Sequence, residues 1–265
     1  MASGSGEDAA EALTRLDAIT RRLRRECPWD REQDERSIVP HTVEEAYELA
    51  DAAERRDDAK LLDELGDVLF QVHFLALLLE ERGAGDLARV AGHVTEKLVR
   101  RHPHVFGETQ ARTAQEVLRN WDRVKRDEPG REPGLFGEVP ENLPSLLHAR
   151  KVQRRAASSG FDTPDAQAPL HALHGQLLAL EQAGTPEERF HELGDVLFAA
   201  VDVARKLKVD PELALRAAST RFRSRVLSAG KLVASEGGSW DDLPPEQQLA
   251  YYARARLTEG DRQKT

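Results

Sequence analysis

HTVEEAYELADAAERRDDAKLLDELGDVLF, residues 41–70, decides how this chain folds. In its second half the apolar residues recur at helical spacing, as in Leu61, Leu65, Val68 and, just beyond it, Val72. This pattern predicts an amphipathic helix that packs one face into a core. Because only a short polar turn precedes that helix, we expect two antiparallel helices that lie against each other.

Two pairs of carboxylates lie three residues apart in the same stretch, Glu45 with Glu48 and Glu64 with Asp67. On a helical wheel the members of each pair are about one-sixth of a turn apart. Both pairs fall inside the apolar arc of their helix, whereas Glu44 points outward. The hairpin therefore brings four carboxylates face to face at the edge of its core.

Four clustered carboxylates repel one another and raise each other's pKa unless a cation neutralises them. Oxygen-only ligands suit a hard cation, Mg²⁺ or Mn²⁺, and Mg²⁺ commonly adds substrate phosphates to its ligands. Iron is disfavoured, because di-iron bundles need a Glu-x-x-His motif that residues 45–48 and 64–67 lack. The alternative is that these acids only border the core and reach water. Because two such pairs lie on adjacent helices, a metal site with a phosphorylated ligand is favoured over this alternative.

The whole chain is predicted to be all-α, because no stretch keeps the alternation of a strand. Asp210 before Pro211 is typical of a helix start. Three pairs have the spacing of a capping box: Thr42 with Glu45, Thr113 with Glu116, and Thr185 with Glu188.

An internal repeat divides the chain. The heptapeptide ELGDVLF occurs at residues 64–70 and again at residues 192–198. Between the copies, residues 127–143 are rich in proline and glycine and are predicted to be a linker. We therefore expect two tandem helical-bundle modules, residues 10–126 and residues 144–258.

Bulk composition narrows the class of protein. A formal net charge of −9 argues against a nucleic-acid polymer as partner, since that needs a concentrated basic surface. The single cysteine, Cys27, is typical of a reducing compartment. The start of the chain has no signal-peptide pattern, and the most apolar stretch, residues 68–79, is too short to span a bilayer. A soluble cytoplasmic protein is expected.

Several motifs together resemble the MazG-like all-α nucleoside triphosphate pyrophosphohydrolases, in particular their two-module bacterial members. They are the E-E-x-x-E and E-x-x-D pattern of the hairpin, CPWD at 27–30, RRHPHVF at 100–106 and NWDRVK at 120–125. The resemblance implies Mg²⁺-dependent cleavage between the α- and β-phosphates of nucleoside triphosphates, which yields a monophosphate and pyrophosphate. It also implies homodimers that share each bundle, and a role in clearing nucleotide pools.

The expected site has two parts. The metal-binding and catalytic carboxylates are Glu45, Glu48, Glu64 and Asp67. The expected substrate-binding residues are Lys97, Arg100, Arg101, Trp121, Lys125 and Trp29. Cationic side chains suit a triphosphate and tryptophan suits a base, although a solvated basic face and a core tryptophan are the plain alternatives.

The second module departs from this pattern. It keeps Glu192 and Asp195, but its preceding helix has no E-x-x-E. His171 and His174 offer the elements of a site for a softer metal there, although a degenerate, structural copy is favoured. Catalysis is therefore assigned to the first module. The alternative for the whole chain is a catalytically weak nucleotide-binding or dimer-interaction protein.

Overall fold

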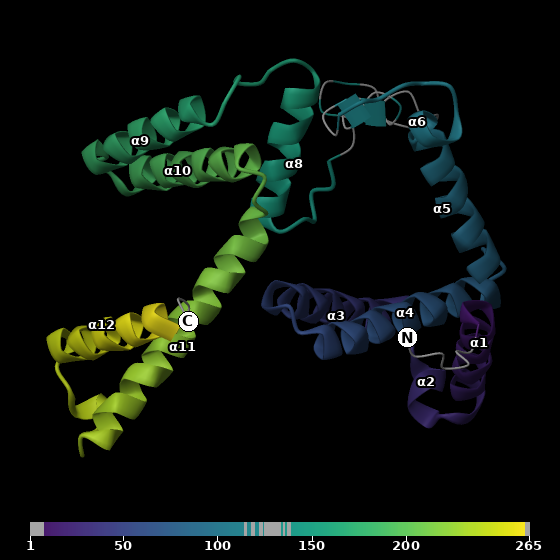
Figure 1. The fold of residues 1–265 in the computed structure, drawn as a ribbon, viewed down its shortest axis with the longest axis horizontal. Helices are drawn as coiled ribbons and strands as arrows, with labels where there is room; N and C mark the ends of the chain where they lie inside the picture. The colour runs from purple at the N-terminus through teal and green to yellow at the C-terminus, as the bar shows by residue number, and fades with distance from the viewer. Residues whose placement is uncertain are drawn as a thin grey trace. The chain divides into compact units, whose positions relative to one another are not determined.

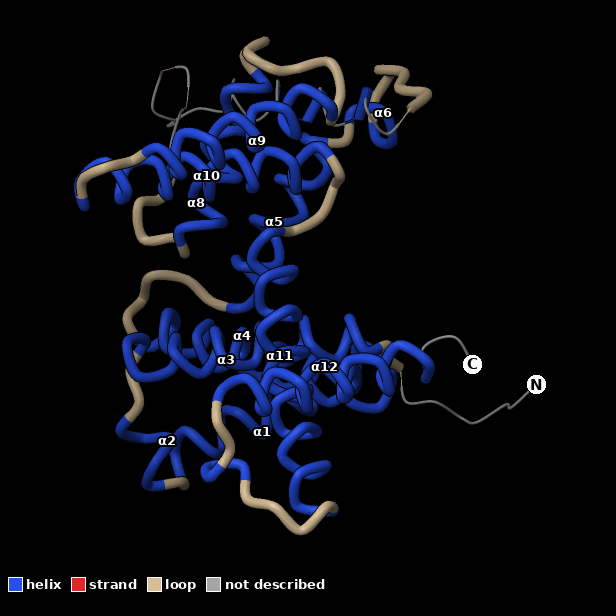
Figure 2. The backbone as a smooth tube through the Cα atoms, turned by 90° about the vertical axis from the view of Figure 1, so that its left-hand side faces the viewer, coloured by secondary structure: helices blue, strands red, loops and turns tan. Residues whose placement is uncertain are grey.

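In the structure, a computed structural model, helices joined by loops and turns make up the described part of the chain, which contains no strand (Figure 2). It describes residues 8–113, 116–117, 120–121, 124, 134, 136 and 139–262, with side chains to residue 258. The all-α prediction is confirmed. Among these residues no helix combines the length and the apolar composition that a membrane crossing needs.

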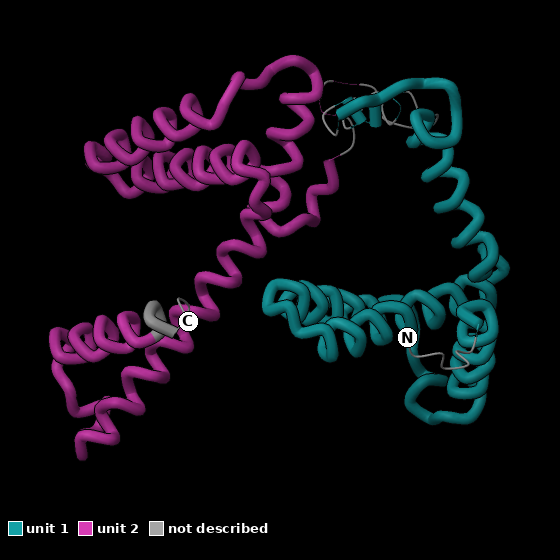
Figure 3. The backbone as a smooth tube through the Cα atoms, in the orientation of Figure 1, with its two compact units in different colours: residues 1–128 teal, residues 129–265 magenta. Residues whose placement is uncertain are grey.

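The chain divides into two compact units, Met1–Glu128 and Pro129–Thr265 (Figure 3). Most of the predicted linker, residues 127–143, lies outside the described residues. The helices of the first unit are α1 (Ala9–Glu26), α2 (Pro28–Glu32), α3 (Glu35–Arg55), α4 (Asp58–Glu81), α5 (Leu87–Arg101) and α6 (Pro103–Phe106). The helices of the second unit are α8 (Ser145–Ser158), α9 (Gln167–Gln182), α10 (Pro186–Lys206), α11 (Pro211–Ser235), η1 (Trp240–Asp242) and α12 (Pro245–Arg262).

Helices α3 and α4 form the expected antiparallel hairpin (Figure 1). The turn between them is two residues long, because α3 ends at Arg55 and α4 begins at Asp58. Arg56 in that turn adopts a left-handed conformation with φ 55°, which ends α3, and the Asp57 side chain caps α4. The hairpin places the two acidic segments of the sequence side by side.

The start of α3 differs from the prediction. The helix begins at Glu35, so Thr42 lies inside it and its hydroxyl bonds the carbonyl of Ile38. Asp34 is the actual N-cap, and its side chain accepts a hydrogen bond from the Ser37 amide at 2.8 Å. The Ser37 hydroxyl accepts one from the Asp34 amide in return, at 2.9 Å. This reciprocal cap begins the helix, which continues through Pro40.

In the second unit the predicted starts are confirmed. Thr185 and Glu188 form a capping box at the beginning of α10. Asp210 caps α11, with its carboxylate accepting from the amides of Glu212 and Leu213. The third predicted pair is half formed, since the Glu116 amide donates to the Thr113 hydroxyl at 3.2 Å.

The core of the first unit is small. It consists of Ile38, Phe74 and Leu78, each at most 4% exposed, with Phe70 and Leu75 packed against them. These residues fasten the start of α3 to the second half of α4. The core lies beyond the acidic segment of α4, so it fixes the register of the hairpin without enclosing all of the carboxylates.

Several large apolar side chains of α4 are exposed in the single chain. Leu62, Leu65, Leu69 and Val72 are between 38% and 75% exposed. They follow one another at intervals of three and four residues and form one stripe along the helix, here called the α4 stripe. A contiguous apolar stripe of this kind is typical of an interaction surface.

The cap of α3 can be tested directly. Asp34→Ala removes the acceptor for the Ser37 amide, and we expect it to lower the free energy of unfolding by about 1 kcal/mol. Asp34→Asn keeps an acceptor oxygen and is expected to unfold close to the wild type. Urea titration followed by circular dichroism at fixed protein concentration measures both. Equal loss in the two variants would contradict the capping role.

Candidate metal and nucleotide site

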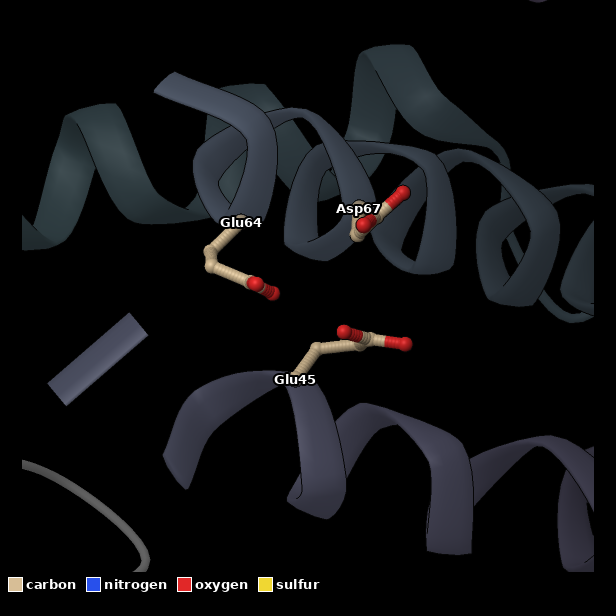
Figure 4. A group of neighbouring side chains, drawn as sticks. All are labelled: Glu45, Glu64 and Asp67. Carbon is tan, nitrogen blue, oxygen red and sulfur yellow. The ribbon is translucent and has the colours of Figure 1, made fainter. Parts of the chain in front are cut away.

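Three carboxylates from the two helices of the hairpin meet in the first unit. Glu45 projects from α3 toward Glu64 and Asp67 on α4 (Figure 4). One oxygen from each lies within 4.8 Å of the others. Among the described residues this is the only such group of histidine, cysteine or acidic side chains. The arrangement offers three oxygen ligands from two helices.

Glu64 is the most constrained of the three, because its residue is only 1% exposed. One oxygen, Oε1, accepts a hydrogen bond from the Lys60 ammonium. The other oxygen, Oε2, is buried and has no hydrogen-bond partner among the described residues. A buried carboxylate oxygen normally has a hydrogen-bond donor or a cation. This orphaned oxygen, together with an all-oxygen donor set, fits a divalent cation such as Mg²⁺.

Lys60 is a site residue that sequence reasoning missed. Its ammonium contacts Glu64 and also lies 3.5 Å from Glu48 Oε2. The signal was present in the sequence, because Lys60 precedes Glu64 by four residues and therefore shares its helix face. Lys60 brings a positive charge to the edge of the cluster.

Glu48 lies beside the cluster, outside the group of three. Its side chain is 57% exposed, and Lys60 is the partner that links it to Glu64. The structure therefore brings Glu45, Glu64 and Asp67 together and leaves Glu48 at the solvent side. A carboxylate in that position can reach water and the outer edge of a ligand.

The electrostatic environment shifts the pKa values of two of these acids in opposite directions. Burial, followed by the nearby charge of Asp67, raises the pKa of Glu45 above its ordinary value. The hydrogen bond from Lys60 lowers the pKa of Glu64. The cluster thus contains one carboxylate that resists ionisation and one that is held ionised by a cation.

The predicted basic residues lie elsewhere in the first unit. Lys97, Arg100 and Arg101 belong to the last turns of α5, and Arg101 ends the helix. Helix α5 leaves the far end of α4 and leads away from the hairpin (Figure 1). About 20 Å of α4 also separates Asp67 from the point where that helix ends. Within one chain, the basic residues and the acidic cluster are therefore apart.

Trp121 joins the basic group. The guanidinium of Arg101 lies over its ring at 5.4 Å, and the His102 ring meets it edge-on at 4.8 Å. Arg101 itself is only 8% exposed. Lys125, predicted one turn further on, lies outside the described residues. The basic side chains at the end of α5 and the Trp121 ring therefore form one group, whose chemistry suits an anionic ligand.

Trp29 belongs to α2 and lies nearer the acidic hairpin. Its ring meets that of His41 at 6.1 Å, and His41 is one helical turn before Glu45 on α3. Trp29 is 52% exposed, so it is not the core anchor that the alternative interpretation required.

In the second unit the repeated ELGDVLF lies on α10, with Glu192 and Asp195 on it. The adjoining helix α9 carries His171 and His174 at exposed positions and contributes no carboxylate to a cluster. Asp195 lines an apolar hollow of about 750 Å³ between α8, α9 and α10. No group like that of the first unit occurs in the described part of α8–α12.

Comparisons with known proteins identify the family of this chain. A family model described as the MazG nucleotide pyrophosphohydrolase domain matches residues 33–106. The nucleoside triphosphate pyrophosphohydrolase/pyrophosphatase MazG of Thermotoga maritima is 37% identical over 87% of this chain and 89% of its own length. The nucleoside triphosphate pyrophosphohydrolase of Escherichia coli K12 is also 37% identical, over 85% of this chain and 89% of its own. A crystal structure of a mazG-related protein from Thermotoga maritima is 28% identical and covers 42% of this chain and 97% of that one, with a TM-score of 0.38.

The raised pKa of Glu45 predicts a pH-dependent stability in protein freed of metal with a chelator. Above its folded pKa, the ionised Glu45 destabilises the folded state relative to the unfolded chain, where the pKa is about 4.3. Glu45→Gln should therefore raise the unfolding temperature at neutral pH. The gain should shrink as the pH falls through the raised pKa toward about 4, because wild-type Glu45 then becomes protonated.

Glu44→Gln is the matched control for this measurement, because it removes the same charge from the same helix at an exposed position. We expect it to leave the neutral-pH unfolding temperature nearly unchanged. Thermal unfolding followed by circular dichroism between pH 4 and 8 tests both variants. An equal rise in the two would show that overall charge, and not the cluster, is responsible.

Proposed function

Since this chain belongs to the MazG family of nucleotide pyrophosphohydrolases, we propose that it hydrolyses nucleoside triphosphates to a monophosphate and pyrophosphate in its first unit. The observation that carries the proposal is the buried Glu64, whose Oε2 lacks a partner inside a group of three carboxylates. Such a group is unfavourable unless a cation binds it, and a nucleoside triphosphate normally arrives with Mg²⁺.

We assign Glu45, Glu64 and Asp67 as the residues that hold the cation, Mg²⁺ or Mn²⁺. When bound, it would neutralise the carboxylates and offset the charge that develops on the phosphate oxygens. Glu64 supplies the fixed ligand, because burial and the α4 backbone hold it in place. Glu48 is the carboxylate best placed to orient the attacking water and to accept its proton, since it borders the cluster and remains exposed.

The cationic residues at the end of α5 and Trp121 are proposed to bind the triphosphate, and Lys125 stays a prediction from the sequence. Arginine engages phosphate oxygens through paired donors, which suits Arg100 and Arg101. Trp29, exposed near the start of α3, is proposed as the platform for the base. The reaction needs the cations and the carboxylates around one ligand, and within a single chain the end of α5 lies away from the carboxylates.

A homodimer resolves that separation. The α4 stripe is exposed in the single chain, and Val90, Val94 and Leu98 form a second exposed apolar row on α5. Burying such rows between two copies is favourable by roughly 25 cal/mol for each Å² removed from water. We propose that the rows meet a second copy, whose α5 cations then complete the site. The single cysteine and the acidic net charge of −9 fit a cytoplasmic enzyme without a nucleic-acid polymer as partner.

The reaction is tested by incubating the protein with separate nucleoside triphosphates and Mg²⁺ and identifying the products. We expect a monophosphate and pyrophosphate. Glu64→Gln should lower the rate by at least about 100-fold, because it removes the fixed ligand of the cation. Glu192→Gln, the same change in the second copy of ELGDVLF, should retain activity. Orthophosphate with a diphosphate, or a greater loss from the Glu192 change, would contradict the proposal.

The dimer is tested at the α4 stripe. Leu65→Glu places a charge in the proposed contact, and we expect a shift toward monomers in light scattering together with a loss of activity. Leu65→Met keeps an apolar side chain of similar volume and should remain dimeric and active. A Leu65→Glu protein that stays dimeric with full activity would place the interface elsewhere.

A further inference from the structure

We propose that Lys60 is a built-in counter-cation that occupies the acidic cluster in the metal-free protein and is displaced when a divalent cation binds. This inference rests on the proposed metal site and concerns how that site exists without metal. Lys60 acts through Glu64 and Glu48, so it is a positioning residue. The need to displace Lys60 would lower the affinity of the site for Mg²⁺.

The first support is the contact itself. The Lys60 ammonium donates to Glu64 Oε1 and lies 3.5 Å from Glu48 Oε2, so one cation links the buried acid to the exposed one. An ionised carboxylate that is 2% exposed is very unfavourable without a partner. Lys60 supplies that partner for one of the two oxygens. It therefore lets the hairpin fold before any metal has bound.

The second support is that Lys60 contacts only part of the cluster. Glu64 Oε2 remains without a partner, and the oxygens of Glu45 and Asp67 remain within 4.8 Å of those of Glu64. One ammonium carries a single positive charge, which is too little to neutralise three carboxylates. A divalent cation would neutralise the cluster better, so the exchange of Lys60 for metal is favourable.

The third support is room for the exchange. The side chain of Lys60 is half exposed, and it lines an open hollow of about 610 Å³ together with Gly66 and Asp67. A Cβ added to Gly66 would meet no atom within 4 Å, so within the single chain the hollow is unobstructed on that side. Lys60 can turn away from Glu64 into this space by rotation of its own flexible chain. No movement of the helices is required.

The chain also contains an internal comparison. The position four residues before the second ELGDVLF is Glu188, and its carboxylate accepts the amides of Gly184 and Thr185 at the start of α10. A lysine is therefore not needed there for the helix or for the heptapeptide. At this position a lysine occurs in the first unit, where the acids cluster, and a glutamate occurs in the second unit, where they do not.

The experiment compares Mg²⁺ binding to metal-free wild type, Lys60→Met and Lys60→Arg by calorimetry, with thermal unfolding of the same samples. Lys60→Met should unfold at a lower temperature without metal, because Glu64 loses its partner. It should also bind Mg²⁺ about three- to tenfold more tightly, since no ammonium has to leave. Lys60→Arg keeps a cation and should bind within about twofold of the wild type.

Arg55→Met is the matched control. It removes the same charge from an i,i+4 ion pair with Asp51 in the same hairpin, away from the cluster. If Arg55→Met tightens Mg²⁺ binding as much as Lys60→Met does, net charge explains the effect and the proposal fails. It also fails if Lys60→Met binds Mg²⁺ with unchanged or weaker affinity.

Two further outcomes separate this proposal from the metal site itself. If the wild type binds no Mg²⁺ and Glu64→Gln changes nothing, the metal site and the role of Lys60 are both overturned. If Lys60→Met folds only when Mg²⁺ is added, its helical circular dichroism can be titrated with metal. Recovery at a lower Mg²⁺ concentration than stabilises the wild type supports the exchange, and recovery at a higher one overturns it.

Discussion

The burial of one carboxylate, Glu64, is the constraint on which the first unit depends. The α3–α4 hairpin leaves this residue 1% exposed, next to Glu45 and Asp67. An acid in that place destabilises the fold unless positive charge accompanies it. Lys60 provides part of that charge from the preceding turn of the same helix. The unsatisfied remainder supports the proposal of a cation site at this end of the hairpin.

A single chain leaves this architecture incomplete in two respects. The core around Ile38 and Phe74 is small, and the α4 stripe lies outside it. The cations at the end of α5 are also remote from the acids they would serve. The proposed second copy would answer both features, because it would cover the stripe and supply the cations. The proposed assembly would thus stabilise the fold and complete the site by the same contact.

The two halves of the chain use one heptapeptide in two ways. In the first unit, ELGDVLF faces a helix that contributes Glu45, and Phe70 packs on the core. In the second unit the same residues face α9, which contributes no carboxylate, and Phe198 is 45% exposed beside an apolar hollow. The heptapeptide therefore does not by itself make a metal site. The partner helix decides whether its two acids gain a third.

Sequence periodicity predicted most of the local structure. It predicted an all-helical chain and the α3–α4 hairpin, because these depend on the 3.6-residue repeat and on a short turn. Of the four acids that it placed inside the apolar arc, Glu64 is buried and Glu45 is partly buried, whereas Glu48 and Asp67 are exposed. The capping-box spacing of Thr42 and Glu45 placed a helix start wrongly at Thr42, because the reciprocal cap of Asp34 and Ser37 begins α3 at Glu35. Short-range patterns could not rank these two signals.

The sequence by itself determined which residue types face the hairpin interior and which half of the chain carries a full set of acids. Only the tertiary structure decided that Glu48 stays at the solvent edge, that Lys60 enters the cluster and that Arg101 lies over Trp121. Those outcomes depend on the register of two packed helices and on side-chain rotamers. Register is set by distant contacts such as Ile38 with Phe74, which no local pattern records.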